Sequence, residues 1–183
     1  MNPSPIPTLK TERLTLRPFG LSDAPDVQRL AGDRQVASTT LNIPHPYEDG
    51  MAEAWIGTHE PNWNAQEHLT LAITSESEGL VGAISLILEL QHRKAELGYW
   101  IGVPYWNRGY ATEAAQAVLA FGFNELGLNR IEAHYLAQNP ASGKVMEKLG
   151  MQQEGLLRQH ILKSGVPDDI VLYGILSAEY KGP

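Results

Sequence analysis

The chain has 183 residues, of which 43% are hydrophobic and 19% are charged, a composition typical of a globular protein with one substantial core. The net charge is −7, whereas a nucleic-acid-binding protein normally carries an excess of basic residues. No apolar run is long enough to span a membrane. The absence of cysteine excludes disulfides, thiolate metal sites and a cysteine nucleophile. The six histidines form no cluster with metal-ligand spacing, so no metal is expected. We therefore expect a cytoplasmic protein with a single domain over residues 1–183, in which residues 1–10 form a loose N-terminal arm.

The hydrophobic periodicity predicts strands and helices in a mixed order. In chain order we expect a strand at 13–17, a helix from Ser22 or Asp23 to about 31, an irregular segment at 38–47, a helix at 48–57, strands at 69–74, 80–89 and 93–103, a helix at 109–126, a strand at 130–137, a short helix from 139 to 150, and two strands within 152–176 around a turn at 164–165. This order predicts a mixed α/β sheet and excludes a repeating βαβ array.

Residues 99–115 form the most informative segment, because a strand there leads through a tight turn into a helix. The first amides of a helix have no partner within the helix, and its N-terminus attracts anions. Gly109 would let the backbone approach a phosphate closely, so the segment suits a pyrophosphate, although a plain strand–loop–helix connection would look similar. The sequence lacks the Gly-Lys-Ser/Thr of a P-loop and the third small residue of a dinucleotide fingerprint.

Within this segment, Trp106-Asn-Arg-Gly109-Tyr-Ala111 resembles the acetyl-CoA-binding motif of the GNAT N-acetyltransferase superfamily, Gln/Arg-x-x-Gly-x-Gly/Ala. It departs from the motif at Trp106. The segments 9–18, 139–150 and 154–173 are similar to further signatures of the branch that contains the RimJ/RimL ribosomal-protein N-terminal acetyltransferases. The resemblance implies a GNAT-like fold, with a mixed, mostly antiparallel sheet of about six or seven strands flanked by helices.

The resemblance also implies acetyl-CoA as the co-substrate and assigns residues to it. The strand backbone would lie along the pantetheine arm, the turn and helix start would surround the pyrophosphate, and an asparagine amide would bind the pantetheine. The asparagine could equally serve as a helix N-cap, or take both roles. The strand residues along the pantetheine are Tyr99, Trp100 and Ile101. The residues of the turn and helix start around the pyrophosphate are Asn107, Arg108, Gly109, Tyr110, Ala111 and Thr112. The asparagine is Asn139.

Acetyl transfer to an amine needs a group that accepts the amine's proton and a group that protonates the departing thiolate. Glu96 and His134 are the candidate bases, and each could instead be a structural strand residue. Ser142 is the candidate acid by resemblance to the RimJ/RimL type, or else a first-turn serine that bonds backbone amides. Many superfamily members have a tyrosine acid where this chain has Met146.

The acceptor is the least determined part of this interpretation. The resemblance favours the N-terminal amine of a protein or peptide. A small-molecule amine, such as an antibiotic, an amino acid or a polyamine, is the alternative, and a non-catalytic acetyl-CoA-binding sensor is a third. The loop at 38–46 and the aromatic side chains of His45, Tyr47, Trp55 and Trp63 could line the acceptor site. A homodimer is compatible with the sequence but not required by it.

Overall fold

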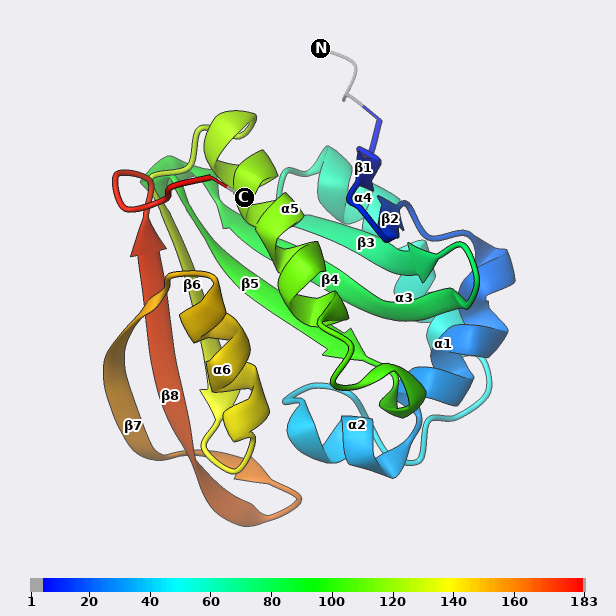
Figure 1. Cartoon of the computed structure of the whole chain (residues 1–183). Coiled ribbons are helices and arrows are strands. Elements are labelled where there is room, and N and C mark those ends of the chain that lie inside the picture. The colour runs from blue at the N-terminus through cyan, green and yellow to red at the C-terminus, as the bar shows by residue number, and fades with distance from the viewer. Residues whose placement is uncertain (1–4, 183) are drawn as a thin grey trace.

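A computed structural model describes residues 5–182 and contains one eight-stranded sheet (Figure 1). Neighbouring strands are antiparallel except β5 and β6, which are parallel. Across the sheet the strands are β1 (Leu9–Lys10), β2 (Leu14–Arg17), β3 (His68–Ser75), β4 (Gly79–Glu89), β5 (Lys94–Ile101), β6 (Arg130–Leu136), β8 (Val166–Leu176) and β7 (Gln152–Lys163).

The predicted mixed, mostly antiparallel sheet flanked by helices is confirmed. It has one or two strands more than expected, because Leu9 and Lys10 pair with Leu16 and Thr15. The last two residues of the predicted loose arm therefore belong to the sheet, while residues 1–4 lie outside the described residues. The turn between β7 and β8 falls at Ser164 and Gly165 as predicted, and both have the positive φ angles of a hairpin turn.

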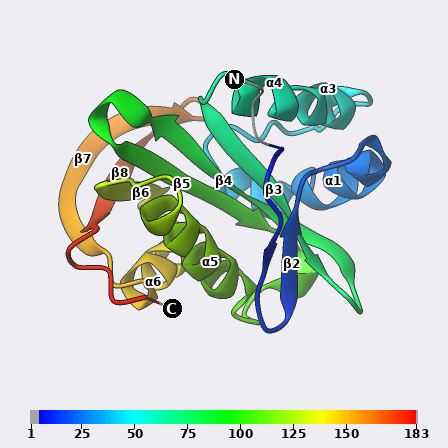
Figure 2. The ribbon, with the colours of Figure 1, turned by 90° about the horizontal axis from the view of Figure 1, so that it is seen from above.

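Helices cover both faces of the sheet (Figure 2). One face carries α5 (Tyr110–Asn124) and α6 (Pro140–Lys148), and the other carries α1 (Ala24–Ala31), α3 (Met51–Gly57) and α4 (His59–Asn64). The short α2 (Arg34–Thr39) lies beside one end of the sheet (Figure 1). Short 3₁₀ turns occupy Leu21–Asp23, Leu90–His92 and Val103–Tyr105.

Two details of the helix prediction are wrong. The segment 48–57 becomes helical only at Met51, because Gly50 before it adopts a left-handed conformation with φ 84°. The helical path breaks at Thr58, and Pro61 lies in the first turn of α4, where proline is tolerated. We did not predict α2, whose six residues bury only Val36 and Ala37, too few to show a helical period.

The start of α1 is fixed by an ion pair. Both oxygens of the buried Asp23 carboxylate accept hydrogen bonds from Arg17, at 2.8 Å each, and one also accepts from the Gly20 amide at 2.8 Å. The Arg17 hydrogen bonds hold the pKa of Asp23 below its ordinary value. Asp23, one of the two residues predicted to begin this helix, is the N-cap of α1, but its side chain makes no cap hydrogen bond to α1.

We expect Asp23→Asn to lower the free energy of unfolding at pH 7 by about 2 kcal/mol, the scale of a lost charged hydrogen-bond pair. A lowered folded-state pKa stabilises the fold fully above the unfolded aspartate pKa of about 3.9, and this stabilisation disappears as the pH falls through the folded value. Urea titrations from pH 7 downward should therefore show the two proteins converging. Asp26→Asn, which breaks only the exposed pair with Arg29, is the matched control and should cost about 0.5 kcal/mol or less. Equal losses in the two variants would contradict this account.

Candidate active site: a cleft between two parallel strands

The parallel strands β5 and β6 pair over three residues only, from Lys94–Glu96 on β5 to Arg130–Glu132 on β6. Beyond that point β5 continues alongside β4 to Ile101, and β6 continues alongside β8 to Leu136. The two strands therefore diverge (Figure 1). The opening is a cleft of about 1190 Å³, lined from both faces of the sheet.

The backbone of β5 presents free polar groups to this cleft. Arg93 accepts hydrogen bonds through its carbonyl from the amides that begin β6, while the Gly102 amide donates to Val81 on the β4 side. The direction of the backbone N–H and C=O groups alternates from one residue of a strand to the next. The backbone groups of the odd-numbered residues of β5 therefore point toward β6, and those of the even-numbered residues point toward β4. Both polar groups of Tyr99 therefore face the cleft, whereas the Ile101 carbonyl already accepts from Trp106 Nε1 at 2.7 Å. The Trp100 backbone faces β4, although Trp100 lines the cleft, so its role beside the pantetheine stays a prediction.

The N-terminus of α5 lies at one end of the cleft. Asn107 and Gly109 both have positive φ, at 62° and 79°, and this turns the chain sharply into a helix of 15 residues whose N-cap is Gly109. No side chain caps this end, so the first amides stay available to a ligand. Five of the six predicted residues of the turn, Asn107, Gly109, Tyr110, Ala111 and Thr112, line the cleft. Arg108 instead pairs with Glu78 at 2.9 Å, outside the cleft lining.

A residue that the sequence analysis missed supports this turn from outside. Arg13 donates from Nη1 to the Arg108 carbonyl at 3.0 Å and from Nε to Glu113 at 2.7 Å. Glu113 also accepts from the Thr11 hydroxyl at 2.6 Å and the Arg13 amide at 2.8 Å. The hairpin of β1 and β2 thus fixes the first turn of α5. A pair 100 residues apart in the chain gives no signal in a single sequence.

The N-terminus of α6 lies on the β6 side of the cleft. Gly143 is packed so closely against Tyr135 that a Cβ there would lie 2.8 Å from its ring. This contact brings Ser142 within reach of β5, where its hydroxyl hydrogen-bonds the Tyr99 hydroxyl at 2.7 Å. Asn139 is the N-cap residue, but its side chain makes no cap bond and donates instead to the Thr39 carbonyl at 3.2 Å.

The two candidate bases face each other. Glu96 on β5 and His134 on β6 lie where the strands begin to diverge, with Glu96 Oε1 3.2 Å from His134 Nδ1. Both side chains are partly exposed and line the cleft. Such a contact can orient the imidazole and assist it in accepting a proton. Of the predicted catalytic residues, the structure thus brings Glu96 and His134 together, with Ser142 beside the same cleft.

Aromatic and apolar side chains form the cleft wall on the face that carries α1 and α3. Tyr47 and Trp55 belong to this wall, whereas Trp63 and His45 do not line the cleft as described over residues 5–182. Three of its lining residues are large, exposed hydrophobic side chains: Leu41 at 37%, Met51 at 38% and Ile87 at 40% exposure.

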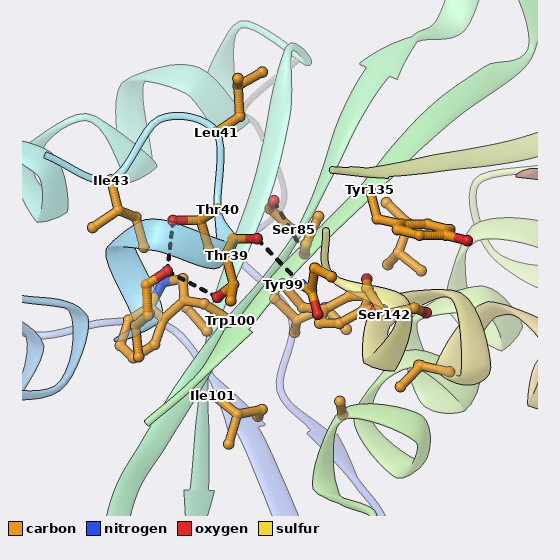
Figure 3. Close-up of a pocket in the computed structure, with 18 of the residues that line it drawn as sticks. Thr39, Thr40, Leu41, Ile43, Ser85, Tyr99, Trp100, Ile101, Tyr135 and Ser142 are labelled. Atoms are coloured by element: carbon orange, nitrogen blue, oxygen red, sulfur yellow. Dashed lines mark hydrogen bonds between the residues drawn. The ribbon is translucent and has the colours of Figure 1, made fainter. Parts of the chain in front are cut away.

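The loop after α2 closes one side of the cleft and is held by two distant side chains. Lys163, at the end of β7, donates to the carbonyls of Thr40 at 2.5 Å and Leu41 at 3.3 Å. Together with Asn139 on the Thr39 carbonyl, it connects the last residue of α2 and the two loop residues after it to the other side of the cleft. Figure 3 shows Thr39, Thr40 and Leu41 at the cleft. Burial lowers the pKa of Lys163.

For the amine acceptor that the sequence predicts, we expect Lys163→Met to raise the KM about tenfold, because losing hydrogen bonds worth about 1.4 kcal/mol would leave the loop less ordered. The affinity for the predicted acetyl donor should stay unchanged, because the backbone amides expected to bind that donor lie at the start of α5. Steady-state kinetics with each substrate varied in turn separates the two effects. Lys10→Met, on β1 at the opposite edge of the sheet, is the control. An unchanged acceptor KM in Lys163→Met would contradict a role for this loop.

The cleft fits acetyl-CoA by its own features. It combines free strand backbone at Tyr99 with an uncapped helix N-terminus that suits a pyrophosphate. Gly109 at that N-terminus is exposed, and without a side chain it lets a ligand approach the backbone closely. Within residues 5–182, no three His, Asp or Glu side chains form a group that could hold a metal ion. Nor does that part of the chain contain a helix long and apolar enough to cross a membrane.

Comparisons with known proteins agree with this geometry. Residues 13–152 match the Acetyltransferase (GNAT) domain family. The uncharacterized N-acetyltransferase p20 of Bacillus licheniformis is 34% identical over 178 residues, covering 96% of this chain and 99% of that protein. YdaF of Bacillus subtilis (strain 168), provisionally named a ribosomal N-acetyltransferase, is 36% identical over 180 residues, covering 93% and 95%.

Solved structures show the same fold. The GNAT-family acetyltransferase of Bacillus anthracis has a TM-score of 0.83 and 29% identity, covering 94% of this chain and all of that one. The spermidine N-acetyltransferase of Vibrio cholerae, solved with CoA and spermine, has a TM-score of 0.80 at 23% identity, covering 93% and 99%.

The fold and these comparisons together define an acyltransferase. The chain belongs to the GNAT acetyltransferase family. It is an acetyl-CoA-dependent N-acetyltransferase.

Proposed function

We propose that this enzyme acetylates the N-terminal amine of a protein or peptide, in the cytoplasm, by direct transfer within a ternary complex. The proposal depends chiefly on one observation: the Glu96–His134 pair lies in the cleft that also receives the α5 N-terminus, so a bound thioester and an incoming amine can meet there. The provisional name of YdaF, a ribosomal N-acetyltransferase, supports a protein acceptor.

The charge of the cleft favours an acceptor with a single positive charge. Among the described residues that line the cleft, Glu96 is the one carboxylate, and the lining also includes the lysines Lys144 and Lys148. A polyamine carries several charges, and each would need a partner when it leaves water. The exposed apolar side chains of Leu41, Met51 and Ile87 suit the first side chains of a peptide instead.

The proposed roles follow from position. When bound, acetyl-CoA supplies a thioester carbonyl that is open to attack by an amine. The amides from Asn107 to Thr112 hold the pyrophosphate, and the Tyr99 backbone holds the pantetheine. Glu96 and His134 take the proton of the amine, directly or through water. Ser142 gives a proton to the departing sulfur.

The test is a competition between acceptors. Peptides with a free N-terminus and one internal lysine are compared with spermidine, and mass spectrometry locates the acetyl group. We expect acetylation of the N-terminus, with kcat/KM at least about tenfold above that for spermidine, a difference of about 1.4 kcal/mol. Preference for spermidine or another small amine would replace this proposal with the small-molecule alternative. Acetyl-CoA binding without turnover of any amine would indicate a sensor.

A further inference from the structure

Tyr99 has a contact that its predicted backbone role does not explain. Its hydroxyl lies 2.7 Å from the Ser142 hydroxyl and 3.2 Å from the Ser142 carbonyl. The two side chains come from β5 and α6, which approach the cleft from its two sides, and both line it (Figure 3). The cleft therefore contains a tyrosine hydroxyl in direct contact with the candidate acid Ser142. This tyrosine comes from β5 and not from α6, where many superfamily members have a tyrosine acid and this chain has Met146, buried at 1% exposure.

The contact constrains the single hydrogen of each hydroxyl. When Tyr99 donates to Ser142 Oγ, the Ser142 hydrogen is free to point into the cleft. Burial raises the pKa of Tyr99 to about 12, so the phenol stays protonated at neutral pH and remains a hydrogen-bond donor. A neutral donor of this kind orients the serine and favours partial negative charge on its oxygen.

We propose that Tyr99 is a positioning residue, whose hydroxyl holds Ser142 so that the serine can protonate the leaving sulfur. This inference depends on the proposed function. The amine nitrogen forms a bond to the acetyl carbon as the carbon–sulfur bond breaks, and the electron pair of that bond goes to sulfur. Ser142 Oγ gives its proton to the sulfur and regains one from water. Glu96 and His134 take the proton that the amine loses and release it to the solvent from which Ser142 is reprotonated, so protons balance over the cycle.

The test uses Tyr99→Phe, which removes one oxygen and leaves the ring in place. We expect kcat to fall about tenfold, with the dissociation constant for acetyl-CoA, measured by calorimetry, within about twofold of wild type. Ser142→Ala should lower kcat at least as much, and the double variant should lose little more than Ser142→Ala alone, because Tyr99 acts through the serine. Ser142→Thr, which keeps the hydroxyl, should recover part of the loss.

Tyr173→Phe is the matched control. The Tyr173 hydroxyl donates to Glu147 at 3.3 Å. Glu147 lies on α6, the helix that carries Ser142, but neither Tyr173 nor Glu147 lines the cleft. The kcat of this variant should stay within about twofold of wild type. Multiplicative losses in the Tyr99–Ser142 double variant, or an unchanged kcat in Tyr99→Phe, would overturn this inference while leaving the acetyltransferase assignment intact. If the wild-type protein acetylates none of the amines tested, the proposed function fails first, and this inference with it.

Discussion

Gly109→Glu is expected to weaken acetyl-CoA binding by at least about a hundredfold, equivalent to about 2.7 kcal/mol. Gly109 caps α5 with φ 79°, is exposed and lines the cleft. A carboxylate there would place negative charge beside the amides that are to hold a pyrophosphate, and its Cβ would start 3.4 Å from Arg13 Nη2. Electrostatic repulsion and occupied space therefore act in the same direction. Calorimetric titration with acetyl-CoA measures the loss.

The control must share the backbone strain, because a non-glycine residue at positive φ costs about 1–2 kcal/mol wherever it lies. Gly50 provides it: it is the N-cap of α3, with φ 84° and open space around its Cβ position. Gly50→Glu should lower the melting temperature about as much as Gly109→Glu while binding acetyl-CoA normally. Normal binding in Gly109→Glu would show that the pyrophosphate site lies elsewhere.

Glu96→Gln is expected to lower kcat about a hundredfold, within the usual contribution of a positioned general base. The amide keeps the shape of the side chain but cannot take a proton or stabilise a positively charged His134, which lies 3.2 Å away. His134→Gln should cause a similar loss, and the double variant should lose little more, since the two residues act as one unit. Acetyl-CoA affinity should not change. Single-turnover measurements at saturating acetyl-CoA isolate the transfer step.

Glu132→Gln serves as the matched control. Glu132 pairs directly with Glu96 across the two strands, but its carboxylate bonds Arg130 at 2.9 Å and Lys94 at 3.1 Å and does not line the cleft. This variant should lose some stability and keep its kcat. If Glu96→Gln also kept its kcat, Glu96 would be a structural partner of His134, and the base would have to be sought elsewhere.

The sequence predicted the elements with a strong periodic pattern, including β3 to β6, α5 and α6. It failed where the pattern is short, as in α2 and β1, or where one residue's conformation decides, as at Gly50. The strand predicted at 93–103 places Glu96 and Trp100 on one face by its alternation. This alternation could not show which backbone groups face β4, because this depends on pairing with a strand in another segment. The sequence analysis therefore grouped Trp100 with Tyr99 and Ile101, although the Trp100 backbone is paired with β4.

The site was predicted in part. Residues of the turn before α5 were recognisable because glycine, helix start and motif coincide locally. The residues that support them were not: Arg13 on Glu113, Lys163 on Thr40 and the Tyr99 hydroxyl on Ser142 are contacts between segments at least 43 residues apart. Contacts of this kind depend on how β5 and β6 diverge and on how closely α6 packs at Gly143, and neither feature has a local sequence signal.

We propose that acetyl-CoA binds between β5 and β6 and presents its acetyl group to Glu96 and His134. A crystal structure of the protein with CoA tests it most directly. We expect the pyrophosphate on the amides of the turn before α5, the pantetheine beside the Tyr99 backbone, and the sulfur near Ser142. CoA bound anywhere else, or with its sulfur remote from both Ser142 and the Glu96–His134 pair, would contradict the account.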